Sequence, residues 1–463
     1  MIRMQIHIFV LLDDKDKTMK NTINMKKKSL MIVIAALTMS MTTLRAQQGV
    51  WEFPNMVSTG SIVRDAGSFG ILVYNDDGFF HTFSLMQEGE DSANTIFVTM
   101  DTVCDVYIFK GCAFFCGSRT DANGSHAAVG WFSLSGFPNV TVYYGDDTTY
   151  SVYKKMEVYL HVQKAQLMTP STRAIMIALD KNGHTQLPVV IWNSYTSSSI
   201  LVQHYTNTIN QVFCDIAQTD KYFIFTAHNS GWIVAYYYIW LIPKPVGLSM
   251  YTFEYSFSYF RTPFPSGTDI KVEPCSGDYY AVVASTYNSG MSVAYMNWSY
   301  VFNFDRWYLW NYLRVLDIKY NPSGACFSVL SSDLANLSPG SQRIYNSVFT
   351  SLFSADTVYG FNPYTAMRSY SIDKISSETG GFVASSSNKV TKKLRLFKYT
   401  YNHQGSCLTN SSVKQEELHY DPITPTESGF DCSFSTIPVQ VASPNKKKYQ
   451  IITICSSNKN TKQ

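Results

Sequence analysis

The sequence lacks the short motifs by which many enzyme families are identified. Its 463 residues contain no His-Glu-x-x-His, no Gly-x-Ser-x-Gly and no Gly-rich loop followed by Lys-Ser or Lys-Thr. They also contain no Cys-x-x-Cys pair, which excludes a zinc knuckle or a thioredoxin-type redox site. The nine histidines are scattered without the spacing of metal ligands. No catalytic residue, metal ligand or cofactor is therefore predicted.

Helical signals are scarce as well. No long stretch combines a 3.6-residue apolar period with capping residues. The 32 Tyr, the 29 Phe and the Thr- and Val-rich runs favour β-strands instead. The composition therefore predicts an all-β protein.

A block recurs about seven times along the chain. It begins with a run such as Asp-Ile, passes through a polar turn and continues as an apolar strand that ends in small polar residues. Intervals between its Asp positions are 54, 48 and 56 residues, with one interval of 110 that corresponds to two periods. Proposed block starts lie near Val63, Asp105, Glu157, Asp215, Asp269, Asp317, Asp373 and Ser433. A period of about 40 to 55 residues with several strands is typical of a β-propeller blade.

One period can be divided into four candidate strands. They cover residues 270–272, 279–286, 292–298 and 307–315, and Gly, Asn, Pro and Ser turns separate the first three. We therefore predict a β-propeller of seven four-stranded antiparallel blades. Six or eight blades, a β-sandwich array and a β-helix are the alternatives. The first and last blocks are expected to build one blade together, which removes free sheet edges.

The first 46 residues have the features of an export signal. A basic cluster, Lys26 to Lys28, precedes an apolar stretch at 30–41 that is too short to span a bilayer, and cleavage is expected near Ala46. Residues 1–24 are interpreted as leader upstream of a true start at Met25. The alternative is an N-terminal membrane anchor. The mature domain is predicted to be a single β-propeller at 47–463 without a transmembrane segment.

Removal of that leader changes the charge of the chain. Eight of the 37 basic residues and three of the 34 acidic residues lie in residues 1–46. The formal charge of +3 therefore becomes about −2 in the mature chain. The basic isoelectric point of the whole sequence gives no argument for nucleic-acid binding.

Nine cysteines in an exported chain leave at least one thiol unpaired. A turn at Lys110-Gly111 would bring Cys104 diagonally near Cys116, and a hairpin near Asn445 would bring Cys432 toward Cys455. The alternative is that these are small buried apolar residues. In the same hairpin, the three lysines 446–448 are expected to form a solvated tip.

The acidic residues of the repeat have two interpretations. The favoured one is that each Asp pins a turn at the start of an innermost strand by accepting backbone N–H groups of the neighbouring loop. The other is a ring of carboxylates that lines a central channel and binds a cation or a basic partner. The acidic pairs 76–77 and 146–147 and the calcium-like run 180–184 are interpreted as turns.

One aromatic segment is a candidate binding surface. Trp307, Tyr308 and Trp310 fall within residues 306–312, and alternate residues of a strand face opposite sides. Flat aromatic faces suit stacking on sugar rings or on the side chains of a peptide. Packing between blades is the alternative explanation.

The junction Leu44-Arg45-Ala46-Gln47-Gln48, together with the Asp-Ile blocks, resembles the uncharacterised secreted β-propeller-like proteins of Bacteroidetes. The resemblance covers essentially the whole mature chain and concerns the fold. It implies a periplasmic, outer-membrane-associated or secreted protein. We predict a binding module for a glycan or a protein partner. The alternatives are a glycan hydrolase or lyase with carboxylates at the channel mouth, and a structural scaffold of a surface complex.

Overall fold

The computed structural model divides by its contacts into two units, Met1–Ala46 and Gln47–Gln463. All described residues belong to the second unit. Described are residues 49–456 except for 88–89, 91, 123, 136–140, 145–149, 162–170, 193–198, 207–210, 230–236, 245–256, 262–269, 276, 288–289, 299–302, 312, 334–343, 350–357, 361–366, 377–380, 389, 401–408, 411–414, 419–425, 429–430, 442–445 and 451. The boundary between the units coincides with the expected cleavage point, and cleavage itself stays a prediction.

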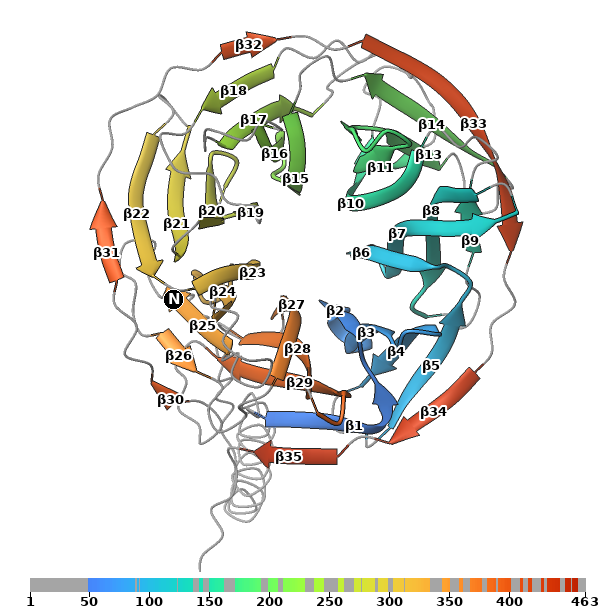
Figure 1. Cartoon of the computed structure of the whole chain (residues 1–463), viewed down its shortest axis with the longest axis vertical. Coiled ribbons are helices and arrows are strands. Elements are labelled where there is room, and N and C mark those ends of the chain that lie inside the picture. Colours follow the sequence, from blue (N-terminus) through green and yellow to red (C-terminus); the bar gives the residue numbers. More distant parts are fainter. Residues whose placement is uncertain are drawn as a thin grey trace, which may run out of the picture. The chain divides into compact units, whose positions relative to one another are not determined.

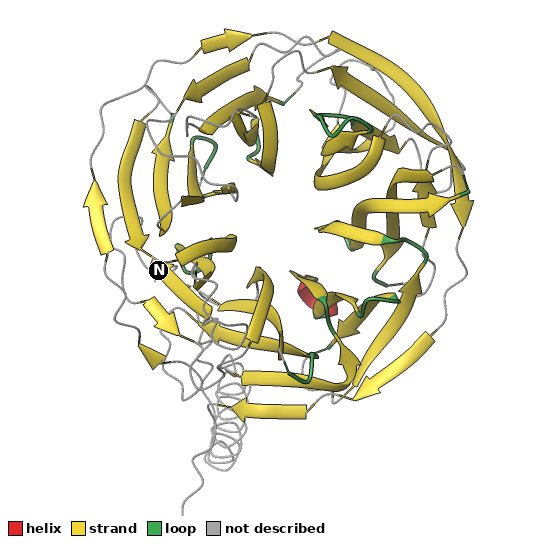
Figure 2. Cartoon of the chain, viewed as in Figure 1, coloured by secondary structure: helices red, strands yellow, loops and turns green. Residues whose placement is uncertain are grey.

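The described chain is all-β and is built from small antiparallel sheets (Figure 2). Its one helical element is the 3-10 turn η1 (Gly67–Phe69). One sheet consists, in the order of its hydrogen-bonded strands, of β27 (Met367–Ile375), β28 (Gly381–Asn388), β29 (Lys393–Thr400), β1 (Gly49–Val57) and β35 (Ile452–Ser456). Another consists of β2 (Gly60–Asp65), β3 (Ile71–Asp76), β4 (His81–Met86), β5 (Ser92–Val98) and β34 (Lys446–Gln450).

Three further five-stranded sheets follow the same order. They are β15 (Gln211–Gln218), β16 (Tyr222–Asn229), β17 (Tyr237–Pro243), β18 (Phe257–Arg261) and β32 (Thr426–Ser428); β19 (Ile270–Pro274), β20 (Tyr280–Tyr287), β21 (Gly290–Asn297), β22 (Asn303–Asn311) and β31 (Gln415–Leu418); and β23 (Leu313–Asn321), β24 (Cys326–Asp333), β25 (Ile344–Phe349), β26 (Val358–Gly360) and β30 (Thr409–Asn410).

A larger sheet of ten strands contains two such sets that share one outer strand. The first set is β6 (Thr102–Phe109), β7 (Cys112–Asp121), β8 (Gly124–Ser133) and β9 (Thr141–Tyr144). The second set is β10 (Tyr150–His161), β11 (Ser171–Asp180), β13 (Val189–Trp192) and β14 (Ser199–Thr206). The short strand β12 (Thr185–Gln186) pairs with β11, and the shared outer strand β33 (Asp431–Val441) lies between β9 and β14. Figure 1 shows all these sheets around a common centre, with the first strand of each set innermost. The arrangement is β-propeller-like.

The repeated blocks coincide with these sets. Six of the proposed block starts lie on innermost strands, on β2, β6, β10, β15, β23 and β27. Asp269 lies outside the described residues, immediately before β19. Within that period, the first three predicted strands correspond to β19, β20 and β21. The predicted fourth strand at 307–315 is wrong in its bounds, because β22 ends at Asn311 and the next innermost strand begins at Leu313.

Each sheet packs its two faces against neighbouring sheets, so the core is a series of apolar layers between them. One layer joins Phe83 and Ile96 of the β2–β5 sheet to Phe115 and Phe132 of the next. Another joins Phe225 and Trp240 of the β15–β18 sheet to strands β10 and β11. This two-sided burial explains why strands of the repeat are apolar on both faces.

Strand β1 occupies the fourth position of the sheet that begins with β27. It pairs antiparallel with β29, where Trp51 lies opposite Leu396. The expectation that the first and last blocks share one blade was therefore wrong. The Val63 block forms its own four strands, and Ser433 lies on β33. The N-terminal strand and three later strands complete one sheet instead.

The strands β30 to β35 lie outside the other strands, each beside a different set (Figure 1). We call them the outer belt. The described strands on either side of Asn445 do not pair with each other as the predicted hairpin requires. Strand β33 pairs with β14 and β9, β34 with β5, and β35 with β1. Lysines 446–448 lie on β34 opposite β5, so they do not form a hairpin tip. Each belt strand belongs to a different sheet. Its backbone groups form hydrogen bonds with a strand that would otherwise be the free outer edge of that sheet.

The tight turn at Lys110-Gly111 is present, with positive φ at both residues. The disulfide considered beside it is not formed: Cys104 and Cys116 are both free, as the alternative of unpaired cysteines requires. The pairing register passes from Val103 directly to Asp105, so Cys104 is the extra residue of a β-bulge and has no partner position in β7. Cys116 packs as a small apolar residue in the core. The side chains of Cys432 and Cys455 lie outside the described part.

Candidate functional site

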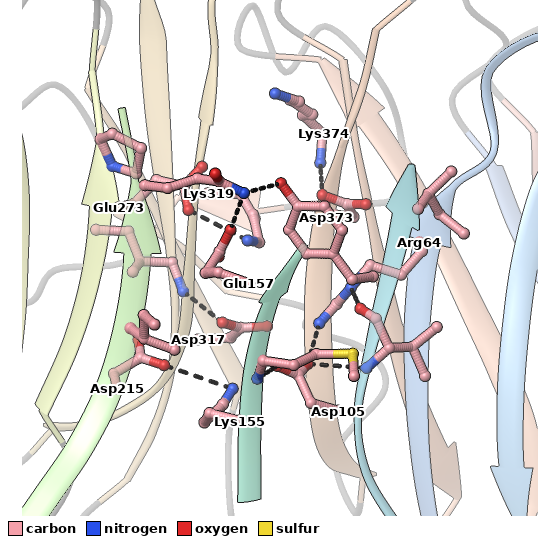
Figure 3. Close-up of a pocket in the computed structure, with 18 of the residues that line it drawn as sticks. Arg64, Asp105, Lys155, Glu157, Asp215, Glu273, Asp317, Lys319, Asp373 and Lys374 are labelled. Atoms are coloured by element: carbon pink, nitrogen blue, oxygen red, sulfur yellow. Dashed lines mark hydrogen bonds and ion pairs between the residues drawn. The ribbon is translucent and has the colours of Figure 1, made fainter. Parts of the chain in front are cut away.

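A cavity of about 320 Å³ lies between the innermost strands. We call it the central pocket. Its lining is dominated by charged side chains, and Figure 3 shows them converging from several strands. The labelled residues are Arg64, Asp105, Lys155, Glu157, Asp215, Glu273, Asp317, Lys319, Asp373 and Lys374.

A β-bulge precedes the pocket-lining segment of several innermost strands. In β6, β15 and β23 the extra residue comes directly before the repeated Asp, at Cys104, Cys214 and Leu316. The strands β10 and β27 have equivalent bulges. A bulge bends a strand and re-aims the side chains that follow it. The recurring bulge therefore helps to direct these side chains toward the pocket.

Three aspartates each link the innermost strand on which they lie to the innermost strand of the following set. Each accepts a hydrogen bond from a backbone N–H group of that strand. The pairs and their O–N distances are Asp105 with Met156 at 3.2 Å, Asp215 with Val272 at 3.0 Å and Asp317 with Ile372 at 3.0 Å. Asp105 and Asp317 also accept the N–H group of the residue that follows them.

Two further acids make the same kind of link. Each stands two residues after the position that the three aspartates occupy in their own strands. Glu273 accepts the N–H group of Tyr320 at 3.2 Å, and Asp373 accepts that of Asp65 at 2.8 Å. Five acids thus accept neighbouring backbone N–H groups and line the central pocket at once. The favoured sequence interpretation was correct in kind, although the N–H groups belong to strands and not to loops.

Three partly buried cations compensate these acids. Arg64 donates to Asp105 at 2.8 Å and to the backbone oxygen of Val106, so it joins β2 to β6. The ammonium group of Lys155 lies 3.6 Å from Asp215, and that of Lys319 lies 3.1 Å from Glu273. The chain therefore supplies cations to its own ring of carboxylates.

The pKa values follow from burial and from these neighbours. Burial opposes ionisation of Asp105, but Lys155 and Arg64 outweigh it and hold its pKa below the ordinary value. Burial raises the pKa of Glu273 and of Asp373 despite nearby cations. Burial tends to lower the pKa of Lys319, but Glu273 raises it above the usual range.

Glu157 differs from the other pocket acids. It stands at the position of Glu273 and Asp373, but its described hydrogen bond comes from a side chain: Nε2 of Gln218 donates to it at 2.7 Å. Burial raises the pKa of Glu157 to about 8, so this carboxyl is protonated at neutral pH. A neutral carboxylic acid at a cavity wall is a recognised feature of functional sites.

Gln218 connects this carboxyl to a second cavity. Its Nε2 is also within hydrogen-bond distance of the Tyr107 hydroxyl oxygen and the Val158 backbone oxygen, so its two N–H groups are shared among three acceptors. Its Oε1 accepts from Lys244 at 2.6 Å. Tyr107 and Gln218 line both cavities. Burial lowers the pKa of Lys244.

The second cavity, about 660 Å³ in volume, lies where the innermost strands of four consecutive sheets end. We call it the mouth groove. Its lining includes Phe109 and Lys110 from the end of β6, Asp220 and Lys244 beside the β15–β18 sheet, and Asp278 after β19. Lys110 lies 5.6 Å above the Phe109 ring. Asp278 forms an ion pair with Lys221 at 3.2 Å.

The predicted aromatic segment lies away from both cavities. Trp307, Tyr308 and Trp310 are on β22, the fourth strand of its sheet, between β21 and the belt strand β31. Their side chains lie outside the described part, so their role as a binding surface stays a prediction.

The structure bears out two of the predicted turns. Asp180 accepts the N–H groups of Asn182 and His184, and Asp77 accepts those of Phe79 and Phe80. Residues 146–147 lie outside the described part. Within the described residues, no group of three or more His, Cys, Asp or Glu is arranged to hold a metal ion, and no helix is long and apolar enough to cross a bilayer.

Sequence reasoning missed Glu157, Gln218, Lys244 and the mouth groove as a site. The available signal was the departure of Glu157 and Lys155 from the Asp-Ile pattern of the repeat. Compared with known proteins, the chain matches no family model and no curated protein.

Proposed function

We propose that the chain is an exported β-propeller of seven blades that acts as a binding module for a glycan or a protein partner. The blade count is supported by the strand order, because seven innermost strands each begin a set of four antiparallel strands. The hydrogen bond from Asp65 to Asp373 joins the last set to the first, as a ring requires. Export is supported by the features of residues 1–46 and is tested by the N-terminal sequence of the protein recovered outside the cytoplasm.

The mouth groove is the observation that carries this function. It is large enough for a short oligosaccharide or a peptide segment, since ligand sites typically have volumes of about 300 to 1,000 Å³. Phe109 is partly exposed and gives the groove apolar surface, and the ammonium groups of Lys110 and Lys244 supply donors. Aromatic faces with a few polar groups suit sugar rings and peptide side chains alike.

Binding is favoured over catalysis by the state of the pocket acids. Five of them already accept a backbone N–H group of a neighbouring strand. A carboxylate engaged in this way serves the fold and is poorly suited to taking or giving protons. The pocket acids are thus explained by the structure they hold together, and the groove remains for a ligand.

The test is a thermal-shift screen of the chain from Gln47 against polysaccharides and peptides. A ligand that binds only the folded protein raises the melting temperature by mass action, by an amount that saturates as the site fills. Phe109→Ala is expected to abolish the shift. Phe79→Ala is the matched control, because Phe79 is 89% exposed in a turn at the opposite end of its sheet. An equal loss of binding in both variants would refute the groove as the site.

A glycan hydrolase or lyase is a second candidate, favoured by Glu157 alone. A carboxyl that is protonated at neutral pH is suited to donate a proton to the leaving oxygen of a glycosidic bond. The test is an assay for new reducing ends or unsaturated sugars with any glycan that binds. Glu157→Gln should abolish cleavage by an enzyme and should leave binding in place. The absence of product from every bound glycan would exclude this candidate.

A further inference from the structure

Glu157 is the pocket acid that departs from the repeated linkage. At the equivalent position, Glu273 and Asp373 accept backbone N–H groups of the next sheet. Glu157 receives instead the amide of Gln218, which belongs to the next innermost strand, β15. A repeat that performs one structural task at most positions is expected to depart from it where a site is built.

The contact between Glu157 and Gln218 lies directly beneath the mouth groove. The Gln218 amide group holds Glu157 and Tyr107 on its nitrogen side and Lys244 on its oxygen side. The bond to Lys244 holds that ammonium group at the groove wall, where its Nζ also lies 5.1 Å from the centre of the Phe223 ring. The position of a groove cation therefore depends on an amide that Glu157 orients.

The charges of the groove favour an anionic ligand. Four charged residues line it, and Asp278 is already neutralised by Lys221. Lys110 and Lys244 then exceed Asp220, and the carboxyl beneath them carries no charge at neutral pH. The ammonium groups of Lys110 and Lys244 are hydrogen-bond donors that suit carboxylate oxygens.

We propose that the mouth groove binds a glycan through carboxylate groups on its sugars, with Lys110 and Lys244 as the cationic contacts and Glu157 as a positioning residue beneath them. This inference rests on the proposed function and names its ligand class. Sugar rings contact the partly exposed Phe109 side chain, and the carboxylates face the two ammonium groups. Ionisation of Glu157 would place a negative charge under Lys244 and weaken its attraction for the ligand.

Several charged or titratable groups surround Glu157 and contribute to this behaviour. They are Tyr107 and Asp105 of β6, Glu273 of β19, Lys319 of β23 and Lys244 after β17. Lys319 favours ionisation of Glu157, whereas Asp105 and Glu273 oppose it. Lys244 is the other group whose charge can change as the pH rises, because burial lowers its pKa.

The experiment compares two polymers that share one backbone, polygalacturonate and its methyl ester, by calorimetric titration of the chain from Gln47. The carboxylate form is expected to bind at least tenfold more tightly at pH 6.5, and Lys244→Met should remove about tenfold of that affinity. Lys110→Met should remove roughly fivefold. Lys181→Met, in an exposed turn outside both cavities, is the matched control and should change nothing.

The pH profile tests the part assigned to Glu157. Affinity for polygalacturonate is expected to fall by about tenfold between pH 7 and pH 9 as the carboxyl ionises. Glu157→Gln keeps a neutral amide in its place, so it should retain the affinity at pH 7 and remove the decline. Lys244→Arg keeps its cation at every pH, so a decline that persists in this variant belongs to Glu157.

The possible failures are distinguishable. Equal binding of the ester and the free acid would overturn the carboxylate inference and leave the groove as a glycan site. A peptide that binds in the groove in place of any glycan would overturn it too. If no ligand depends on Phe109, the proposed function itself fails. A steep pH profile that survives in Glu157→Gln would remove the role of that residue.

Discussion

Replacement of Arg64 by Met is expected to loosen the junction of three sheets. The guanidinium group of Arg64 donates to Asp105, to the Val106 backbone oxygen and to the Ser371 hydroxyl. These partners lie on β6 and β27, whereas Arg64 lies on β2. The side chains of Arg64 and Asp105 are only 13% and 9% exposed. The substitution therefore leaves a carboxylate and a carbonyl oxygen in the interior without their main cationic donor.

Removal of one partner of a buried ion pair costs about 3 to 5 kcal/mol. The lower end applies here, because Asp105 keeps the N–H groups of Val106 and Met156 and the nearby charge of Lys155. A loss of about 3 kcal/mol in a domain of this size corresponds to a melting temperature about 4 °C lower.

The assay is urea unfolding of the chain from Gln47, followed by tryptophan fluorescence, with Lys181→Met as a control that removes an exposed cation. The double variant Arg64→Met, Asp105→Asn should recover part of the loss, because the uncompensated carboxylate is then gone. If Arg64→Met and Lys181→Met unfold within about 0.5 kcal/mol of each other, the buried junction contributes little and the reasoning is refuted.

Three further predictions follow from the fold. The pKa of Glu157 rises from 4.5 to about 8 on folding, so between these pH values the folded chain holds a proton that the unfolded chain releases. The contribution of the protonated Glu157 to stability is therefore present below pH 4.5 and is lost as the pH rises toward 8. Urea midpoints should fall by the equivalent of about 4 kcal/mol over that window, and a profile as steep in Glu157→Gln would contradict this. Gly117→Ala should cost about 1 to 3 kcal/mol, since its Cβ would lie 2.0 Å from the Thr102 backbone oxygen; an unchanged thermal midpoint would show that the strands can separate freely. A chain that ends before residue 409 lacks the outer belt and exposes the outer edges of the sheets, so light scattering should detect self-association; a stable monomer would show that the belt is dispensable.

The fold class could be predicted from the sequence because the repeat is local. A strand of alternating or apolar residues that ends in a Gly or Asn turn is encoded within about ten residues, as at Lys110-Gly111. Each block therefore indicated its own strands. The strand that completes a sheet is different, because β1 and β29 are far apart in the chain and only their free edges bring them together.

The belt illustrates the same limit. Lysines 446–448 and the flanking strands resemble a hairpin when they are considered locally. Their backbone groups pair instead with the edges of distant sheets, such as β5. No local pattern reports where an unpaired edge will be.

The sequence by itself determined that the chain is all-β, that it is built from repeated blocks and that an acid recurs near the start of each block. These properties depend on residue type and spacing. Only the tertiary structure decided that the acids accept N–H groups of neighbouring sheets, that Arg64, Lys155 and Lys319 are their counter-ions and that Glu157 departs from the pattern. These properties depend on which innermost strands become neighbours around the centre. Burial there, which no stretch of sequence specifies alone, acts together with these neighbouring charges on the pKa values of Asp105, Glu157, Glu273 and Lys319.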